Sequence, residues 1–226
     1  LPVPMGADDQ DGAGPGQATE YFVKNGYDVT ALELSTEQVR FLERKFAGDR
    51  NFRCVCSAFE DYACEAKSLD LIFSATAFHW IQPEIGYPKA YGLLRTNGAM
   101  AVFWHLASIV APETEMLCRV RKIYRAYAPE LDDYISRAQA EELHRLRIVQ
   151  MQTGGLFQNP VSKIYRWNDE YDTARYLKLM NSYSDFHAIG GTARTAILNS
   201  TAEYIDSRGG WITIPQEVRM YMARRE

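Results

Sequence analysis

The sequence predicts an α/β protein with a Rossmann-like, doubly wound and mostly parallel seven-stranded sheet. Short β-rich segments alternate with helical patterns between Gly12 and about His105, as they do in βαβ units. A glycine-rich loop opens the first of these helices. The chain has 226 residues, of which 46% are hydrophobic, and this suits one large domain that carries an insertion.

Local signals in the first half predict the elements in order. A helix over 18–24 ends at Asn25-Gly26, and a buried strand follows at 27–34. Ser35 is the expected N-cap of the next helix, with Gln38 at the capping-box position. We read no strand in the residues directly before the glycines, so the first strand of the sheet is left open. The remaining expectations are strands at 51–57, 68–74 and 99–104, a helix at 87–94 and a turn at 96–98.

The second half is mostly helical and rich in aromatic residues. Helical spacing of apolar residues is seen at 113–127, 137–154, 173–183 and 193–208. After Gly209-Gly210, two short runs at 211–214 and 217–223 are expected to form an antiparallel hairpin. The predicted domains are therefore a Rossmann-like core of residues 1–110 and 208–226, and a helical insertion of residues 111–207.

Composition excludes several classes of function. The net charge is −4 and the pI is near 5.7, so we expect no nucleic-acid partner. The sequence contains no run of 18 or more apolar residues, so we expect no membrane span. We also see no secretory signal at its start. The four cysteines match no zinc-binding spacing. We expect no metal site, reduced thiols and a cytoplasmic location.

The strongest local signal is the loop that contains Gly12, Gly14 and Gly16. Glycine at every second position lets the backbone approach a ligand, and the following helix directs its free N–H groups there. A dinucleotide pattern would have its third glycine one residue later. Glu33 ends the next apolar run and could accept two hydrogen bonds from a ribose diol. The alternatives are an ordinary surface turn and an exposed glutamate near a helix start.

These segments resemble, in the right order, the motifs of class I S-adenosylmethionine-dependent methyltransferases. The resemblance implies S-adenosylmethionine as cofactor, its amino-acid tail cradled by Gly12, Gly14 and Gly16. It also implies Glu33 on the ribose, with Asp11 a candidate for the cofactor's amino group by proximity alone. The remaining implied contacts are Leu34, Ser57, Ala58 and Phe59 around the adenine, and Ser74 and Ala75 beside the sulfonium.

A narrower resemblance concerns Ser-Ala-Thr-Ala-Phe-His-Trp, residues 74–80, together with the stretches 123–129 and 183–187. These are similar to the small-molecule branch near the trans-aconitate methyltransferases. His79 and Trp80 are then expected to face the methyl acceptor, with His79 a possible base for a hydroxyl or amine nucleophile. The insertion is expected to cap the substrate. Other pocket candidates are Thr76, Tyr124, Tyr183 and His187, with Arg175 or Arg194 for an acidic acceptor.

The resemblance implies an enzyme that methylates a small organic molecule, with a carboxylate or hydroxyl oxygen as candidate acceptor atoms. We expect a monomer or homodimer with no membrane partner. Two alternatives stay open at this point. One is an NAD(P)- or flavin-binding oxidoreductase, against which the glycine spacing argues. The other is a non-catalytic protein that binds S-adenosylmethionine.

Overall fold

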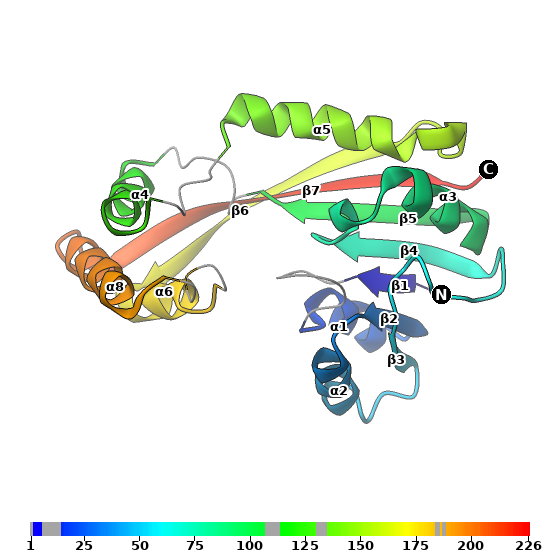
Figure 1. Ribbon diagram of the computed structural model, residues 1–226, viewed down its shortest axis with the longest axis horizontal. Coiled ribbons are helices and arrows are strands. Elements are labelled where there is room, and N and C mark those ends of the chain that lie inside the picture. Colours follow the sequence, from blue (N-terminus) through cyan, green and yellow to red (C-terminus); the bar gives the residue numbers. More distant parts are fainter. Residues whose placement is uncertain (1, 6–14, 107–113, 130–134, 184–185, 187–188) are drawn as a thin grey trace. The chain divides into compact units, whose positions relative to one another are not determined.

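The computed structural model describes residues 2–5, 15–106, 114–129, 135–183, 186 and 189–226 (Figure 1). The chain divides into two compact units. Unit 1 comprises Leu1–His105, Glu142–Ile164 and Arg219–Glu226, and unit 2 comprises Leu106–Glu141 and Tyr165–Val218. Unit 1 thus includes residues 142–164, which the predicted domains assign to the helical insertion. Within the described residues, no helix is both long and apolar enough to cross a membrane.

The strands confirm an α/β fold with parallel pairing, but they divide into two sheets. The five-stranded sheet has the order β1-β4-β5-β7-β6, and β2 and β3 form a separate pair. The pairs β1–β4, β4–β5 and β2–β3 are parallel. A single seven-stranded sheet is therefore not formed by hydrogen bonds. The strands are β1 (Pro2–Met5), β2 (Val29–Glu33), β3 (Phe52–Cys56), β4 (Leu69–Ala75), β5 (Leu94–His105), β6 (Val161–Asp172) and β7 (Trp211–Arg224).

The first strand, left open by the sequence, is β1. It has four residues, of which Pro2 and Pro4 lack an N–H group. Residues two apart along a strand face the same neighbour, so this proline pair removes both donors from one edge of β1. β1 pairs with β4 and lies beside β2 without a ladder of hydrogen bonds (Figure 1). The prolines account for both the missing ladder and the missing strand signal.

Two helices of unit 1 begin where the sequence predicts them, α1 (Gln17–Lys24) and α2 (Thr36–Lys45). The third, α3 (Pro83–Leu93), begins before the predicted range of 87–94, and the short 3₁₀ turn η1 (Phe78–Trp80) was not predicted. Ser35 caps α2 as expected, its hydroxyl accepting the N–H of Gln38 at 3.3 Å. In a capping box, the side chain of Gln38 would accept the N–H of Ser35. Here the Glu33 carboxylate accepts that N–H instead, at 3.1 Å.

Helices cover both faces of the sheet in unit 1, as a doubly wound fold requires. Phe22 of α1 stacks on Phe73 of β4 with ring centroids 4.3 Å apart. On β5, Trp104 instead meets Arg147 of helix α5 (Arg137–Met151). Neighbouring residues of a strand point to opposite faces, and Phe103 pairs with Ala75 on the face of Phe73. Phe103 and Trp104 therefore mark the α1 face and the α5 face.

Strand β5 starts at Leu94, where a helix end and a turn were predicted at 94 and 96–98. Asn97 has a left-handed φ of 63° inside this strand. Its N–H donates to the carbonyl of Arg225, whose own N–H donates to the carbonyl of Gly98. Asn97 and Gly98 thus both lie opposite Arg225, which makes this a β-bulge with Asn97 in the left-handed conformation. The predicted turn signal is the sequence mark of this bulge.

The predicted hairpin of 211–214 and 217–223 is wrong. The whole segment is one strand, β7, beside β5 and β6. The turn residues Gly209 and Gly210, with φ values of 100° and 77°, lie just before it. Strand β6 was missed because its side chains are exposed along most of its length. An exposed edge strand is held by its backbone and shows no buried alternation.

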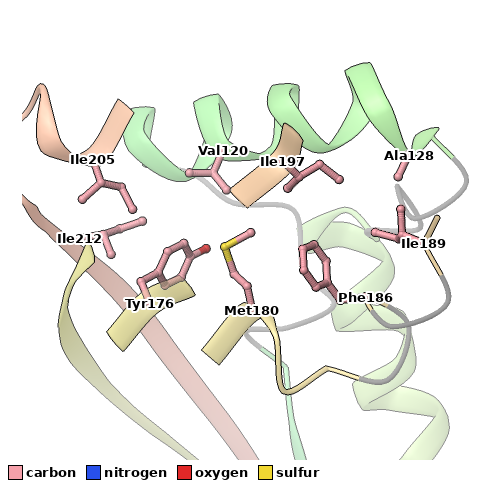
Figure 2. Close-up of a cluster of buried hydrophobic side chains, with 9 residues drawn as sticks. All are labelled: Val120, Ala128, Tyr176, Met180, Phe186, Ile189, Ile197, Ile205 and Ile212. Atoms are coloured by element: carbon pink, nitrogen blue, oxygen red, sulfur yellow. The ribbon is translucent and has the colours of Figure 1, made fainter. Parts of the chain in front are cut away.

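Unit 2 has its own hydrophobic core, built on α4 (Glu115–Tyr127), α6 (Thr173–Met180) and α8 (Gly191–Asp206). Helix α8 packs against both α4 and α6. Figure 2 shows the side chains that meet between them, among them Ile197 and Phe186. The helical start predicted at 173 is confirmed, whereas α4 begins at Glu115 and the predicted position 113 lies outside the described residues. Side chains cap both helices. Thr114 accepts the N–H of Leu117, and Asp172 accepts that of Arg175.

Candidate functional site

The strand order places a candidate site at the carboxyl ends of the parallel strands. From β1 the chain first continues to β2, which lies on one side of β1, and later returns to β4 on the other side. The strand order therefore changes direction at β1. Ligands of open α/β sheets bind at such a switch point. A cavity of about 410 Å³ opens there in unit 1, near the ends of β4 and β5 and the start of α1. Its lining residues are Gln17, Ala18, Tyr21, Phe22, Ala75 and Phe103.

The cavity combines a helix N-terminus with an apolar wall. Helix α1 begins at Gly16, and no side chain of the described residues caps its first turn. The uncapped N–H groups and the positive end of the helix dipole attract a negative group. Tyr21, Phe22 and Phe103 supply apolar surface beside that end. The volume and the lining suit a small ligand with an anionic end and an apolar body.

Gly16 has a structural reason to be glycine. Its φ is +74°, and a Cβ atom would lie 2.8 Å from Leu42 Cδ2 and 3.0 Å from the Phe46 ring. The Nζ of Lys45 also donates to the carbonyl of Pro15 at 2.9 Å. The close approach at Gly16 is therefore to helix α2. Gly12 and Gly14, together with Asp11, lie outside the described residues.

Glu33 ends β2 as predicted and is 2% exposed. Its main-chain carbonyl accepts the N–H of Ser57 at 3.1 Å, so the ends of β2 and β3 meet. Leu34 follows and is 45% exposed, its carbonyl accepting the thiol of Cys56. Burial and the nearby Glu33 raise the pKa of the Cys54 thiol to about 12. The structure thus brings Glu33, Leu34 and Ser57 together.

This second group of predicted residues is separate from the lining of the cavity. None of Glu33, Leu34 and Ser57 lines it. Ala58 is half-buried, and Phe59 is buried with its ring centroid 6.0 Å from that of Phe78. Phe59 therefore contributes to packing below η1.

Ser74, Ala75 and Thr76 at the end of β4 have three different environments. Ala75 lines the cavity, whereas the alternation of the strand turns Ser74 to the opposite face. Within the described part of the chain, the buried hydroxyl of Ser74 has no hydrogen-bond partner. Thr76 has a φ of 54°, which is strained for a β-branched residue. Its N–H donates to the carbonyl of Phe103 at 2.8 Å, which holds this conformation against β5.

His79 is fixed in one tautomer by Trp104. The indole Nε1–H of Trp104 donates to His79 Nδ1 at 3.1 Å. An indole nitrogen only donates, so Nδ1 of His79 carries no proton and the neutral ring carries it on Nε2. Burial and, next, the charge of Arg147 lower the pKa of His79. His79 is therefore a neutral hydrogen-bond donor at pH 7, which differs from the interpretation as a general base.

Trp80 is 61% exposed and lies beside His79, with ring centroids 4.7 Å apart. Both residues belong to η1, which begins two residues after the strained Thr76. An exposed indole next to a fixed N–H donor forms an open surface that combines apolar and polar character. This surface lies at the carboxyl end of β4, and it is the strongest candidate for contact with a second ligand.

The structure adds Arg147, which sequence reasoning missed. Its guanidinium carbon lies 4.2 Å from the centroid of the Trp104 ring, and its Nη1 donates to Gln150 at 3.1 Å. Burial lowers its pKa, while the hydroxyls of Tyr87 and Tyr221 act in the opposite direction. Nothing in the sequence distinguishes Arg147 from Arg145, because only the fold places one of them on the indole.

The predicted pocket residues of the insertion lie in unit 2. Tyr124 packs against the unit 2 core, with its ring centroid 5.8 Å from that of Phe186. Tyr183 is exposed, and His187 lies outside the described residues. Arg175 lies over the ring of Tyr171 at 5.5 Å. Among the described residues, no group of three or more His, Cys, Asp and Glu side chains is placed to hold a metal ion.

Comparison with known proteins agrees with this geometry. Residues 11–102 match the family model described as "Methyltransferase domain". An uncharacterized methyltransferase-like protein of Schizosaccharomyces pombe is 27% identical over 119 residues, which are 52% of this chain and 45% of that protein. The malonyl-[acyl-carrier protein] O-methyltransferase of Enterobacter lignolyticus is 30% identical over 129 residues, 56% of this chain and 47% of that enzyme. The matches span less than half the length of these relatives.

Solved structures share the fold. The geranyl diphosphate C-methyltransferase of Streptomyces coelicolor A3(2) superposes with a TM-score of 0.51 at 15% identity, over 100% of this chain and 70% of that one. Similarity at this level of identity establishes a methyltransferase-type α/β fold. Together with the family model, it places the methyltransferase-domain match on unit 1, around the cavity at α1.

Proposed function

We propose that this chain binds S-adenosylmethionine in unit 1 and transfers its methyl group to a small organic acceptor. The observation that carries the proposal is the cavity at the switch point, where α1 presents an uncapped N-terminus beside apolar side chains. The family match begins at the glycine-rich loop that precedes α1. The geranyl diphosphate C-methyltransferase, which shares the fold, was solved with S-adenosyl-L-homocysteine.

The proposed contacts follow the two groups of residues at the carboxyl edge. Gly12 and Gly14 hold the amino-acid tail near the start of α1, and Ala75 lies beside the sulfonium. Glu33 accepts the ribose hydroxyls, and Leu34 packs on the adenine. A buried carboxylate already held by the Ser35 N–H is oriented for such a role. Ser57, Ala58 and Phe59 border the base in this arrangement, while Gly16 acts through its packing on α2.

Methyl transfer depends more on how the protein positions the two reactants than on proton transfer. When bound, S-adenosylmethionine supplies an activated methyl group, and the electron pair of the broken carbon–sulfur bond stays on the neutral thioether product. The chain must hold the acceptor in line with that bond and exclude water. His79 and Trp80 are proposed to contact the acceptor, with His79 donating through Nε2. Because its other nitrogen is occupied by Trp104, His79 accepts no proton from the acceptor.

Several finer points belong to the same proposal. The acceptor is a small molecule that offers a carboxylate or hydroxyl oxygen, and the kinship with trans-aconitate methyltransferases stays a prediction. Thr76 in unit 1 is a proposed acceptor contact, and the pocket roles of Tyr124, Tyr183 and His187 in unit 2 stay predictions. The cytoplasmic location and a monomeric or homodimeric state also stay predictions.

Calorimetric titration with S-adenosylhomocysteine and, separately, with NAD tests the proposal. We expect one site for S-adenosylhomocysteine and no heat from NAD. A Gly14→Val variant should lose the site, because a branched side chain would occupy ligand space. Gly48→Val is the matched control, since Gly48 is exposed and its Cβ would meet no atom within 4 Å.

Binding of NAD alone would replace the proposal with an oxidoreductase. Binding of S-adenosylhomocysteine without methyl transfer to any member of a broad panel of carboxylic acids, alcohols and amines would indicate a non-catalytic protein. Labelled methyl groups from S-adenosylmethionine provide the readout for that second arm.

A further inference from the structure

Arg147 is a half-buried cation for which the described residues provide no carboxylate partner. Its contacts are the face of Trp104, the Gln150 side-chain oxygen and the field of two tyrosine hydroxyls. A guanidinium keeps its charge at every ordinary pH even when burial lowers its pKa. Removing such a charge from water without a counter-ion is costly. A group retained at that cost has an anion as its natural complement.

Trp104 connects this cation to His79. Its ring face lies under the guanidinium of Arg147, and its ring N–H is bonded to Nδ1 of His79. The indole is 7% exposed, so it is a fixed support for both groups. Part of His79 remains exposed, and its ring lies beside the exposed Trp80, with ring centroids 4.7 Å apart. One buried side chain thus orients a positive charge and a neutral N–H donor at the end of β4 and β5.

The neighbouring hydroxyls belong to the same environment. Tyr87 and Tyr221 are both buried, and the charge of Arg147 opposes the rise that burial causes in the pKa of Tyr87. Tyr221 is further bonded to His144 Nδ1 at 3.0 Å. Aromatic rings and hydroxyl groups therefore surround Arg147 where an ion pair would place a carboxylate. Among the described residues, these surroundings supply Arg147 with no carboxylate.

We propose that Arg147 and the Nε2–H of His79, both held on Trp104, bind a carboxylate group of the methyl acceptor. The inference rests on the proposed function, since it names the acceptor's class. The planar fork of arginine matches the two oxygens of a carboxylate, and an added N–H donor strengthens the bond. The exposed face of Trp80 receives the apolar part of the acceptor. The acceptor is thus a small carboxylic acid.

The test is a calorimetric titration of the protein loaded with S-adenosylhomocysteine. The probes are succinate, glutarate and benzoate, with glutaramide as the uncharged counterpart of glutarate and inorganic phosphate as a different anion. We expect at least one carboxylate to bind and glutaramide not to bind. The expected loss for Arg147→Gln is roughly 10- to 100-fold in affinity, the scale of a lost charge-assisted hydrogen bond. Arg147→Lys should retain part of the affinity, because the charge stays while the fork is lost.

Arg145→Gln is the matched control, since Arg145 lies two residues away on α5 and is exposed in a pair with Glu142. Its affinity should equal that of the wild type. The indole N–H signal of Trp104 in a nitrogen-15 spectrum gives a second readout, which should shift on binding of the carboxylate and not in the presence of glutaramide. Thermal melts establish that each variant is folded. If Arg147→Gln does not fold, the carboxylate affinity of Arg147→Lys is the test.

Three outcomes overturn the inference, and each has a separate meaning. Binding of S-adenosylhomocysteine without binding of any carboxylate refutes the anion site and leaves the proposed function in place. Binding of phosphate alone assigns the pair to a phosphorylated acceptor. Equal carboxylate affinity in wild type and Arg147→Gln puts the carboxylate elsewhere. Failure to bind S-adenosylhomocysteine at all refutes the proposed function itself.

Discussion

Two regions of the molecule hold partly buried charges in opposite ways. In unit 2, the Glu217 carboxylate accepts hydrogen bonds from Arg166 at 2.8 Å and from Arg137 at 3.1 Å. In unit 1, Arg147 lies on an indole, and the described residues offer it no acid. The first arrangement is complete within the fold, while the second leaves a cation that a ligand can satisfy. The hydrogen-bond partners of a charged side chain, more than its residue type, therefore distinguish a structural charge from a candidate site residue.

The aromatic residues show the same contrast. Tyr124 and Tyr176 in unit 2 pack around the core of α4, α6 and α8, which Figure 2 shows for Tyr176. In unit 1, Trp80 is exposed next to a histidine whose tautomer is fixed. Both sets look alike in the sequence. They differ in what each ring contacts after folding. Substitutions in unit 1 and in unit 2 test this difference.

The largest expected effect separates the two charges directly. Glu217→Gln should lower the free energy of unfolding by about 1–3 kcal/mol, because two charge-assisted hydrogen bonds lose their anion. Arg147→Met keeps an apolar stem on Trp104 and removes an uncompensated charge, so its stability should stay within about 1 kcal/mol of wild type. Urea denaturation measures both. A greater loss in Arg147→Met would show that Arg147 is structural and that the contrast fails.

A smaller effect concerns the strained residue at the end of β4. Thr76→Gly should raise the free energy of unfolding by about 1 kcal/mol, because the strain of a non-glycine residue at positive φ exceeds the entropy that glycine costs. Asn97→Gly is the control, since asparagine tolerates its φ of 63° and its change should stay within about 0.5 kcal/mol. If Thr76→Gly were the more destabilised variant, the threonine side chain would be needed for packing.

The smallest effect is the pH dependence that His79 contributes. Its pKa is lowered in the folded state, so the unfolded chain, with a value near 6.5, takes up the proton first. Stability from this group is complete above about pH 6.5 and is lost as the pH falls toward the folded pKa. His79→Gln should flatten that part of the stability profile. A histidine signal titrating above 6.5 by NMR would contradict both the fixed tautomer and the donor role.

Much of unit 1 could be predicted from the sequence, because its signals are local. The Ser35 cap, the strand ending at Glu33 and the α/β alternation depend on neighbouring residues, and the structure confirms them. Strand β6 and the continuity of β7 could not be predicted, since an exposed edge strand shows no burial pattern. Strand β1 was hidden by Pro2 and Pro4.

The candidate site was predictable only in part. The residues after β2, β3 and β4 were predicted from the resemblance to class I methyltransferases, and parallel strands place such residues at one edge of a sheet. The position of Gly16 against α2, the tautomer of His79 and the stacking of Arg147 on Trp104 depend on contacts between distant segments. An acidic acceptor suggested Arg175 or Arg194 from composition alone. The fold instead places Arg147 beside the indole that orients His79.

The most direct test of the central claim is the affinity of Glu33→Ala for S-adenosylhomocysteine, measured by calorimetry beside wild type and the exposed control Glu43→Ala. We expect Glu33→Ala to bind more weakly by about 1–3 kcal/mol, the scale of lost hydrogen bonds to a charged group, and Glu43→Ala to match wild type. A folded Glu33→Ala variant with unchanged affinity would contradict the central claim, because the carboxylate at the end of β2 would then not hold the nucleoside.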